Sequence, residues 1–447
     1  MQSQYLNGLY NKLEKKYFYE PEYLQAVLEF LESLDSCNVI TEEEKNNNYL
    51  EGLLFPDRII SFKVPWYDDN NKLQINTGYR VQFNNSIGPY KGGIRFHESV
   101  NQSIIKFLGF EQVFKNALTG LPMGGAKGGS DFSPKGKSEH EILRFCHSFM
   151  LELHKYIGQF TDVPAGDIGV SKREIGYMYG MYKKLTDEYT GVLTGKAIEY
   201  GGSLCRTEAT GYGLCYLTER MLKVVKNDSF MNKKVIVSGS GNVAIHAALK
   251  VQALGGIVIA MSDSNGYVFN ENGLDLTTVQ EIKEKKRLRI KEYLNYDSNA
   301  IYVDDHKKIW ENKCDIALPC ATQNEVDLKS CQMLVENGCM CICEGANMPL
   351  TLEAVRYLNN TKVLYAPGKA SNAGGVLVSG LEMSQNSMRL KWTFEEVDLK
   401  LKTMMENLFD NLYELALNLG DTNNYLKASN ILGYKRVIEA IKSYKLY

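Results

Sequence analysis

The sequence predicts an α/β protein of two domains, one of which contains a Rossmann-type, doubly wound parallel sheet. Short apolar runs alternate with stretches of helical periodicity from residue 233 onward, and this alternation is typical of a mostly parallel sheet covered by helices. A glycine-rich turn joins the first apolar run to the first helical stretch. The length of 447 residues also exceeds one average domain of roughly 150 residues. The expected strands are residues 233–238, 257–261, 316–318, 340–343 and 363–365.

The first half of the sequence has a different pattern. The N-terminal 40 residues repeat leucine and valine at helical spacing, and residues 59–84 read as two strands separated by a turn. We expect a helix over residues 104–118. It lies between two glycine-rich stretches, 88–95 and 120–130, which we interpret as tight loops. A polar and helical passage follows to about residue 195.

Composition and charge argue against several classes of function. The chain is 44% hydrophobic and 23% charged with a formal net charge of −2, so its global charge gives no reason to expect a nucleic-acid or membrane partner. No apolar run approaches the roughly 18 residues that span a bilayer. The N-terminus lacks the apolar core of a signal peptide. We therefore expect a cytoplasmic protein.

The ten cysteines do not form a disulfide scaffold in a chain of this length. Cys339, Cys341 and Cys343 alternate along an expected strand, which places them on one face, and their spacing is not that of a zinc site. We expect them to be buried and reduced. The sequence shows no cluster of His, Asp and Glu that predicts a bound metal.

A dinucleotide-binding turn follows the first strand of the second half. Gly239 permits the tight turn, Gly241 lets backbone N–H groups approach a pyrophosphate, and Ala244 lets the helix pack closely on the strand. The helix N-terminus adds partial positive charge. A strand before, a helix after and an acidic residue at the end of the next strand are the context that this pattern requires. The expected cofactor contacts here are Gly239, Ser240, Gly241, Asn242, Val243 and the acidic residue Asp263.

The residues leave two interpretations of the coenzyme open. Asp263 stands where a carboxylate hydrogen-bonds a ribose hydroxyl, which favours NAD. Lys283, Lys286 and Arg289 recur every three residues on an expected helix, and such a basic face suits the 2′-phosphate of NADP. The same three side chains also fit an ordinary solvated helix face.

Three lysines lie among or near the glycines of the first half. Lys91, Lys115 and Lys127 fall within about 40 positions, and two such cations can bind the two carboxylates of a dicarboxylate. The third, near other cations and partly desolvated, would have a depressed pKa and so be a usable general base. Asp167 can shuttle a proton from a short loop. The alternatives are solvated surface lysines and an ordinary turn aspartate.

The motifs together resemble those of the small hexameric glutamate dehydrogenases, whose superfamily also contains leucine, phenylalanine and valine dehydrogenases. They occur in family order from about residue 50 to residue 386, and the chain length is similar. The lysine-bearing motifs are highly specific in combination. The matching segments are residues 78–97, 107–132, 161–170, 206–213, 237–244, 262–266, 318–325, 344–349 and 366–386.

The resemblance implies a role for each matching residue. Lys127 is similar to the catalytic lysine, and Asp167 to the aspartate that passes protons to and from the substrate nitrogen. It also implies that Gln112 and Lys115 bind the α-carboxylate, that Lys91 and Ser379 hold the side-chain carboxylate, that Asn347 and Asn372 line the cleft near nicotinamide and substrate, and that Thr210, Ala321 and Thr322 contact the nicotinamide side.

The stretch at residues 262–266 resembles the NADP-dependent branch, which implies NADP(H) as the cofactor. Lys135 and Ser264 match positions that approach the 2′-phosphate in that branch. The basic helix aligns only with a short gap, so the resemblance leaves open which of Lys283, Lys286 and Arg289 contacts the phosphate.

The implied reaction is the reversible reductive amination of 2-oxoglutarate with ammonium to L-glutamate in a homohexamer. The implied domains are a substrate and assembly domain at residues 1–200, to which residues 425–447 return, and a nucleotide domain at residues 201–424, with the active site in the cleft between them.

Three alternatives remain. A dehydrogenase for apolar amino acids would have apolar residues in place of Lys91 and Ser379. A non-catalytic binding protein on the same fold would have no need of Lys127 and Asp167. A metal-dependent oxidative decarboxylase would need paired metal-binding carboxylates.

Overall fold

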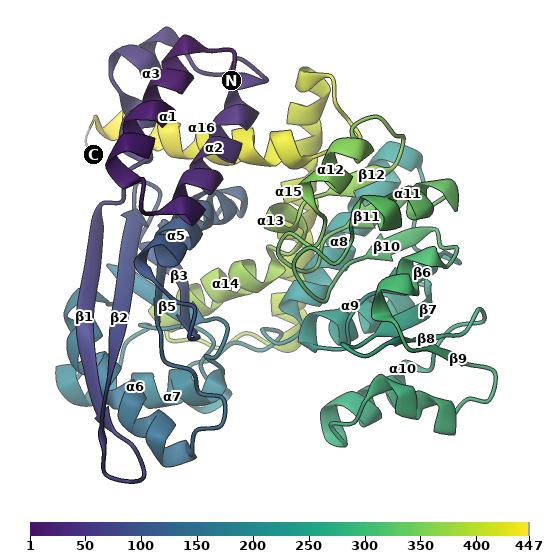
Figure 1. The fold of residues 1–447 in the computed structure, drawn as a ribbon, viewed down its shortest axis with the longest axis horizontal. Helices are drawn as coiled ribbons and strands as arrows, with labels where there is room; N and C mark the ends of the chain where they lie inside the picture. Colours follow the sequence, from purple (N-terminus) through teal and green to yellow (C-terminus); the bar gives the residue numbers. More distant parts are fainter. Residues whose placement is uncertain (446–447) are drawn as a thin grey trace. The chain divides into compact units, whose positions relative to one another are not determined.

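The structure, a computed structural model, describes residues 1–445 and divides into two compact units (Figure 1). The first unit contains Met1–Leu204, Ser379–Thr393 and the C-terminal segment from Asn430. The second contains Cys205–Val378 and Phe394–Ser429. The segment Ser379–Thr393 thus packs with the first unit, although it lies inside the range 201–424 expected for the nucleotide domain. The functional division into domains remains a prediction.

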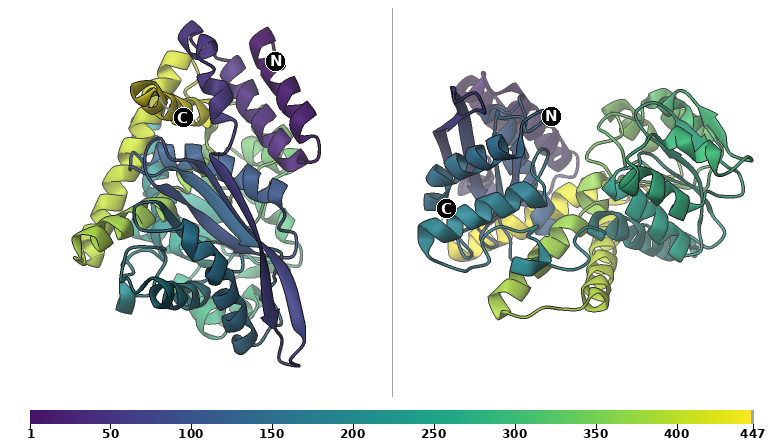
Figure 2. Two further views of the ribbon diagram at one scale, coloured as in Figure 1. Left: turned by 90° about the vertical axis from the view of Figure 1, so that its left-hand side faces the viewer. Right: turned by 90° about the horizontal axis from the view of Figure 1, so that it is seen from below.

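The first unit is built on a five-stranded mixed sheet in the order β1-β2-β4-β3-β5. The long β1–β2 pair is antiparallel and extends beyond the neighbouring helices (Figure 2, left). The strands are β1 Arg58–Tyr67, β2 Leu73–Asn84, β3 Tyr90–Phe96, β4 Gly125–Ser130 and β5 Asp162–Gly166. The helices of this part of the chain are α1 Gln4–Tyr17, α2 Pro21–Asp35, α3 Glu42–Asn46, α4 Tyr49–Leu53, α5 Gln102–Leu118, α6 Glu139–Leu153 and α7 Lys172–Thr186, with short 3₁₀ turns at His154–Tyr156 and Ile198–Tyr200.

The expected N-terminal helices, the hairpin strands and the helix before the second glycine-rich stretch are confirmed. The interpretation of the glycine-rich stretches as loops is wrong, because they contain strands β3 and β4. These strands contain glycines because the sheet leaves no room for side chains at some positions. A Cβ on Gly92 would lie 1.6 Å from the carbonyl oxygen of Ala126. Strand β5 was also missed inside the passage read as helical.

Helices cover the sheet of the first unit. Helix α5 packs on β2 and β4, and α6 packs on β1 and α7. Phe132 stacks on Phe145 at 3.7 Å between ring centroids in an aromatic core beneath α6 and α7. Helix α16 (Leu426–Tyr444) forms the C-terminal part of the chain. Its Arg436 donates to the Ala117 carbonyl at 2.7 Å, which fixes it to the end of α5.

The second unit contains a seven-stranded sheet in the order β12-β11-β10-β6-β7-β8-β9. The five strands from β12 to β7 are parallel, and β8 and β9 are antiparallel additions at one edge. This sheet confirms the expected doubly wound α/β fold. The strands are β6 Lys234–Val237, β7 Ile257–Ser262, β8 Tyr267–Phe269, β9 Ile301–Val303, β10 Ile316–Leu318, β11 Cys341–Cys343 and β12 Leu364–Ala366.

Helices of the second unit flank this sheet (Figure 1). They are α8 Ala209–Met221, α9 Asn242–Ala253, α10 Leu276–Gln280, α11 Leu328–Glu336, α12 Leu352–Leu358, α13 Gly368–Ser371 and α15 Phe394–Leu419. Helix α14 (Gly374–Met388) begins in the second unit, and its residues from Ser379 onward belong to the first unit. Further turns are π-helical at Leu222–Lys226 and Glu281–Lys285, and 3₁₀ at Ile290–Asn295 and His306–Glu311.

All ten cysteines lie among the described residues and have free thiols. Cys339, Cys341 and Cys343 are buried, as expected. The Sγ atoms of Cys341 and Cys343 lie 3.5 Å apart, which confirms that they share one face. Within residues 1–445, every helix is too short or too polar to cross a membrane.

Candidate active site

A lysine–aspartate pair lies on the sheet of the first unit, between strand β4 and the end of strand β5. The Nζ of Lys127 on β4 is 3.2 Å from Oδ2 of Asp167, the first residue after β5. Arg95 on β3 donates from Nε to the same oxygen at 2.8 Å. The side chain of Lys127 is 8% exposed and that of Asp167 is 22% exposed. The pair is therefore desolvated on the lysine side and reachable by a ligand on the aspartate side.

Burial and charge set the protonation of this pair. Burial lowers the pKa of Lys127, and Arg95 lowers it further, while Asp167 opposes the shift. For Asp167, burial disfavours the charged form, but Lys127 and Arg95 outweigh it and hold the pKa of the carboxyl below its usual range. The arrangement gives an ionised carboxylate beside an amine that loses its proton more readily than an ordinary lysine, which suits general acid–base chemistry.

A glycine makes this approach possible. A Cβ on Gly93 would lie 2.9 Å from Cβ of Asp167 and 3.3 Å from Nζ of Lys127. A side chain at this position would therefore separate the two groups.

Lys91 and Ser379 both belong to the first unit. Lys91 on β3 is 1% exposed and donates from Nζ to Oγ1 of Thr194 at 2.8 Å. Ser379 on α14 is 2% exposed. A buried lysine next to a hydroxyl can take up a buried carboxylate. Thr194 was not expected, because nothing in its local sequence distinguishes it.

Helix α5 carries Gln112 and Lys115 one turn apart. Gln112 donates to Oδ1 of Asn116 at 2.8 Å, and Asn116 donates to the carbonyl oxygen of Lys91 at 3.0 Å. Asn116 is fully buried and also bonds the Gly124 carbonyl. Asn116 therefore connects helix α5 to strand β3. Helix α5 carries Gln112 and Lys115, the two residues predicted to bind the α-carboxylate, and β3 carries Lys91. The position of Asn116 beside Lys115 was the only signal for it in the sequence.

In the second unit, the glycine turn has the expected conformation. Gly239 adopts φ +84°, and a Cβ there would meet Cα of Ala321 at 3.2 Å, so Ala321 lies directly beside the turn. Gly241 is the N-cap of α9 and offers no side chain to its N–H groups. A Cβ on Gly241 would meet nothing within 4 Å. A helix N-terminus without a side-chain cap, with room beside Gly241, fits a pyrophosphate.

The basic segment after Asp263 differs from the expected helix. The π-helical turn ends at Lys285, Arg287 adopts φ +56°, and Arg289 precedes a separate 3₁₀ turn. The expected regular helix through Arg289 is therefore wrong, because the left-handed residue ends it. Lys283 contacts Oδ2 of Asp263 at 3.3 Å. Arg289 donates to Oγ of Ser264 at 2.7 Å.

Lys286 points to other partners: its Nζ is 2.6 Å from the Tyr296 hydroxyl and 3.0 Å from Oε1 of Glu281. Asp263 accepts further hydrogen bonds from the N–H groups of Ile290 at 2.8 Å and Asn265 at 3.0 Å. Its carboxylate is thus already occupied by three donors from its own unit.

The remaining residues predicted near nicotinamide lie in the second unit. Asn372 donates to Oδ1 of Asn347 at 2.9 Å, which brings these two together. The buried Glu344 supports this region by accepting from the Gly368 N–H at 2.7 Å and the Tyr365 hydroxyl at 2.9 Å. Burial raises the pKa of Glu344 to about 7. Thr210 lies in the first turn of α8, and Thr322 is exposed beside Ala321.

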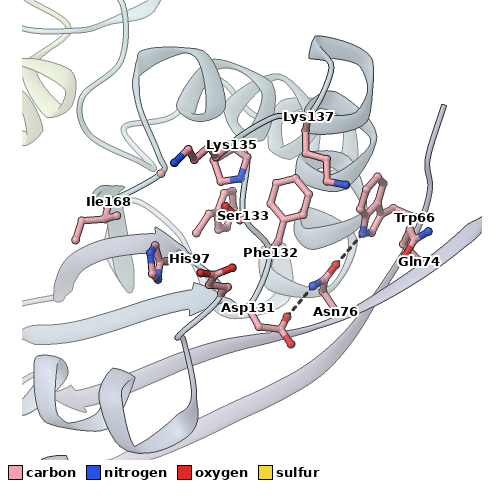
Figure 3. A pocket seen from close by; sticks show the side chains of 14 residues that line it. Trp66, Gln74, Asn76, His97, Asp131, Phe132, Ser133, Lys135, Lys137 and Ile168 are labelled. Atoms are coloured by element: carbon pink, nitrogen blue, oxygen red, sulfur yellow. Dashed lines mark hydrogen bonds between the residues drawn. The ribbon is translucent and has the colours of Figure 1, made fainter.

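Lys135 lines a separate pocket of about 680 Å³ in the first unit (Figure 3). Trp66, Asn76 and Asp131 form a hydrogen-bonded chain along one wall. Among the described residues that line this pocket, Lys135 alone belongs to the predicted site. Lys135 and Ser264 belong to different units.

The structure thus forms two groups of predicted residues, one in each unit. Lys91, Gln112 and the Lys127–Asp167 pair gather at the sheet of the first unit, and the glycine turn, Ala321, Asp263 and Ser264 lie at the second sheet. Within the described part of the chain, no three His, Cys, Asp or Glu side chains are placed to hold a metal ion.

A Rossmann-type sheet with its glycine turn and a second α/β unit with a desolvated lysine–aspartate pair define the class: a two-domain, nucleotide-dependent dehydrogenase. The chain belongs to the Glu/Leu/Phe/Val dehydrogenase family. The family model for Glutamate/Leucine/Phenylalanine/Valine dehydrogenase matches residues 201–444, and that for the Glu/Leu/Phe/Val dehydrogenase dimerisation domain matches residues 56–184.

Its relatives include the NADP-specific glutamate dehydrogenase of Helicobacter pylori, which is 50% identical over 98% of this chain and 99% of its own length. The NAD-specific glutamate dehydrogenase of Bacteroides fragilis is also 50% identical, over 98% of both chains. Among solved structures, Plasmodium falciparum glutamate dehydrogenase is 48% identical, with a TM-score of 0.96 over 99% of this chain and 95% of that one. A hetero-hexameric glutamate dehydrogenase from Thermus thermophilus is 27% identical, with a TM-score of 0.86 over 96% of this chain and 98% of that one.

Proposed function

We propose that this chain is an NADP-linked glutamate dehydrogenase, which interconverts 2-oxoglutarate and ammonium with L-glutamate. The observation that carries the proposal is the Lys127–Asp167 pair at 3.2 Å, with a depressed lysine pKa, in a chain about half identical to glutamate dehydrogenases along its length. Bound NADP(H) supplies the hydride donor or acceptor. The residues of the chain bind the substrate, orient it and move protons.

Each predicted residue has a task in this proposal. Lys127 stabilises and deprotonates the carbinolamine that forms from 2-oxoglutarate and ammonia, and Asp167 moves protons to the departing water. The remaining assignments are Gln112 and Lys115 for the α-carboxylate, Lys91 and Ser379 for the side-chain carboxylate, and Asn347, Asn372, Thr210, Ala321 and Thr322 for the nicotinamide side. Placing the reacting carbon against the nicotinamide and excluding water provides the rest of the catalysis.

Glutamate is favoured over an apolar amino acid because of Lys91. Its ammonium group is buried beside the Thr194 hydroxyl, and a buried cation attracts a side-chain carboxylate but not an apolar side chain. A non-catalytic protein would have no use for the desolvated pair of Lys127 and Asp167.

The preference for NADP over NAD rests on the second unit. Three donors already bind the Asp263 carboxylate and compete with a ribose hydroxyl for its oxygens. Arg289, which donates to the Ser264 hydroxyl, is exposed and can bind a 2′-phosphate. Sequence identity by itself does not decide the coenzyme, because relatives of nearly equal identity are NADP-specific and NAD-specific.

We further propose that the enzyme is a homohexamer in the cytoplasm, without a nucleic-acid or membrane partner. A matched dimerisation domain and a hexameric structural neighbour support assembly. The decisive experiment follows nicotinamide absorbance with 2-oxoglutarate and ammonium, using NADPH and NADH in parallel. Absence of oxidation with both coenzymes would overturn the activity, and equal rates would overturn the coenzyme preference.

A further inference from the structure

A fully buried arginine lies on the side of the first sheet opposite to Lys127. Arg80 on β2 pairs with Gly128 on β4, whereas Val81 pairs with Lys127. Because side chains alternate along a strand, Arg80 and Lys127 point to opposite faces. Arg80 and Asp162 on β5 are both 0% exposed and form an ion pair in which the arginine Nε donates to the carboxylate at 2.9 Å.

The guanidinium of Arg80 can extend across the neighbouring strands because they have glycines, without side chains, at the positions it passes. A Cβ on Gly128 would lie 3.1 Å from Cδ of Arg80, so a side chain there would displace it. The Nη1 of Arg80 reaches β3 and donates to the Gly92 carbonyl at 3.1 Å, with a longer contact to the Gly93 carbonyl at 3.5 Å. Arg80 therefore connects β2 to both β3 and β5.

These two strands lead to the reacting groups. On β3, Gly93 lies against both of them, since a Cβ there would be within 3.3 Å of Lys127 and Asp167 side-chain atoms. Strand β5 begins at Asp162 and ends immediately before Asp167. Gln82 donates to Asp162 at 2.8 Å and completes the support of that carboxylate. A shift of β3 against β5 would change the spacing of Lys127 and Asp167.

We propose that Arg80, through Asp162, is a positioning residue for the reaction, which holds β3 against β5 from behind the sheet so that Lys127 and Asp167 keep their spacing. The inference rests on the proposed function. Arg80 does not touch the substrate-facing side of the sheet. Its positive charge also adds to the factors that lower the pKa of Lys127, after burial and Arg95.

Two substitutions separate geometry from charge. Arg80→Lys keeps the charge but loses the forked contact to Asp162, so kcat should fall while the pH at which activity rises moves less than in Arg80→Met. Arg80→Met loses both, so kcat should fall about 10- to 100-fold and the rise should move to higher pH. KM for glutamate should change by less than about threefold, because substrate binding is not removed.

Two controls keep the test decisive. Lys106→Met breaks another fully buried ion pair of the same unit, with Glu20, and should lower stability without moving the pH profile. If Arg80→Met does not fold, the double variant Arg80→Met/Asp162→Leu replaces the pair by apolar side chains, which buried pairs often tolerate. Wild-type kcat and an unmoved pH profile in either folded variant would overturn the proposal.

A third measurement is independent of the reaction. The rate at which an amine-reactive reagent modifies Lys127, followed by mass spectrometry across a pH series, reports its protonation directly. If the wild type has no activity on glutamate, the proposed function fails, and this profile still tests the role of Arg80. The profile should shift to higher pH in Arg80→Met, and an unchanged profile would overturn the inference.

Discussion

Lys127 and Lys106 are two buried lysines of the first unit, and each has its ammonium group against a carboxylate. Lys106 lies 2.6 Å from Glu20, and both side chains are at most 2% exposed. Its Nζ also sits 3.2 Å from the ring centroid of Tyr17 and 3.9 Å from that of Tyr23. Lys127 instead faces a carboxylate that is 22% exposed and shared with Arg95.

Burial lowers the pKa of both lysines, and that of Lys106 falls to about 8 against the opposing effect of Glu20. A perturbed pKa therefore does not distinguish a reactive group from a structural one. The difference lies in access: aromatic rings enclose Lys106, whereas the partner of Lys127 is open to a ligand. The comparison teaches that the surroundings of the pair define the site.

The largest expected effect is at Lys127. Lys127→Ala should reduce kcat by about 10³- to 10⁴-fold, because a general base and an electrostatic contact are lost together. NADPH binding, measured by fluorescence titration, should persist, since the glycine turn belongs to the other unit. If Lys127→Ala keeps a tenth of the wild-type turnover, Lys127 is not a catalytic base and does not differ from the structural Lys106 in this respect.

Lys106→Met should have the opposite profile. Breaking a buried pair leaves Glu20 uncompensated and typically costs about 3–5 kcal/mol of unfolding free energy. Chemical denaturation should show this loss, and kcat at a temperature where the protein remains folded should stay near the wild-type value. A large fall in kcat with intact structure would contradict a purely structural pair.

Lys91 extends the comparison to a third buried lysine. Lys91→Leu removes the proposed counter-charge of the substrate side chain, and truncating one partner of a buried pair costs roughly 2–5 kcal/mol. That corresponds to about a 30- to several-thousand-fold loss in kcat/KM for glutamate. The double variant Lys91→Leu/Ser379→Val should also gain some activity on norleucine. Glutamate kinetics close to wild type would place the pocket elsewhere.

The basic segment of the second unit offers a matched pair of exposed cations. Arg289→Ala should reduce kcat/KM for NADPH by roughly 10- to 100-fold, the value of a hydrogen bond to a charged group, with little change for NADH. Lys286→Ala is the control, because its ammonium is already held by Tyr296 and Glu281. Equal losses in the two variants would mean that the segment acts only through its net charge.

The smallest effect concerns pH. Arg95→Gln removes a charge that lowers the pKa of Lys127 and also that of Asp167. Both values should rise toward those of ordinary side chains. Because the neutral amine of Lys127 is the active form, glutamate oxidation should then begin at higher pH. A pH–kcat profile that remains in place would show that Arg95 has no influence on the titration of Lys127.

The sequence determined much of this protein by local rules. The apolar runs located the parallel strands of the second unit, and the glycine turn before α9 was readable because Gly239 must adopt a positive φ. The lysines among glycines also identified Lys91 and Lys127 as unusual. These features are legible because each depends on residues adjacent in the chain.

The tertiary structure decided the rest. The glycine-rich stretches are strands, because contacts such as Gly92 against Ala126 come from a neighbouring strand. Arg95, Thr194, Asn116 and the Arg80–Asp162 pair support the site across distances of up to 103 positions in the chain, as for Lys91 and Thr194. The left-handed Arg287 interrupts the basic segment before Arg289, and Lys286 donates to the Tyr296 hydroxyl. Desolvation and partner charge arise only when the chain folds, so the pKa of Lys127 could not be read from its neighbours in sequence.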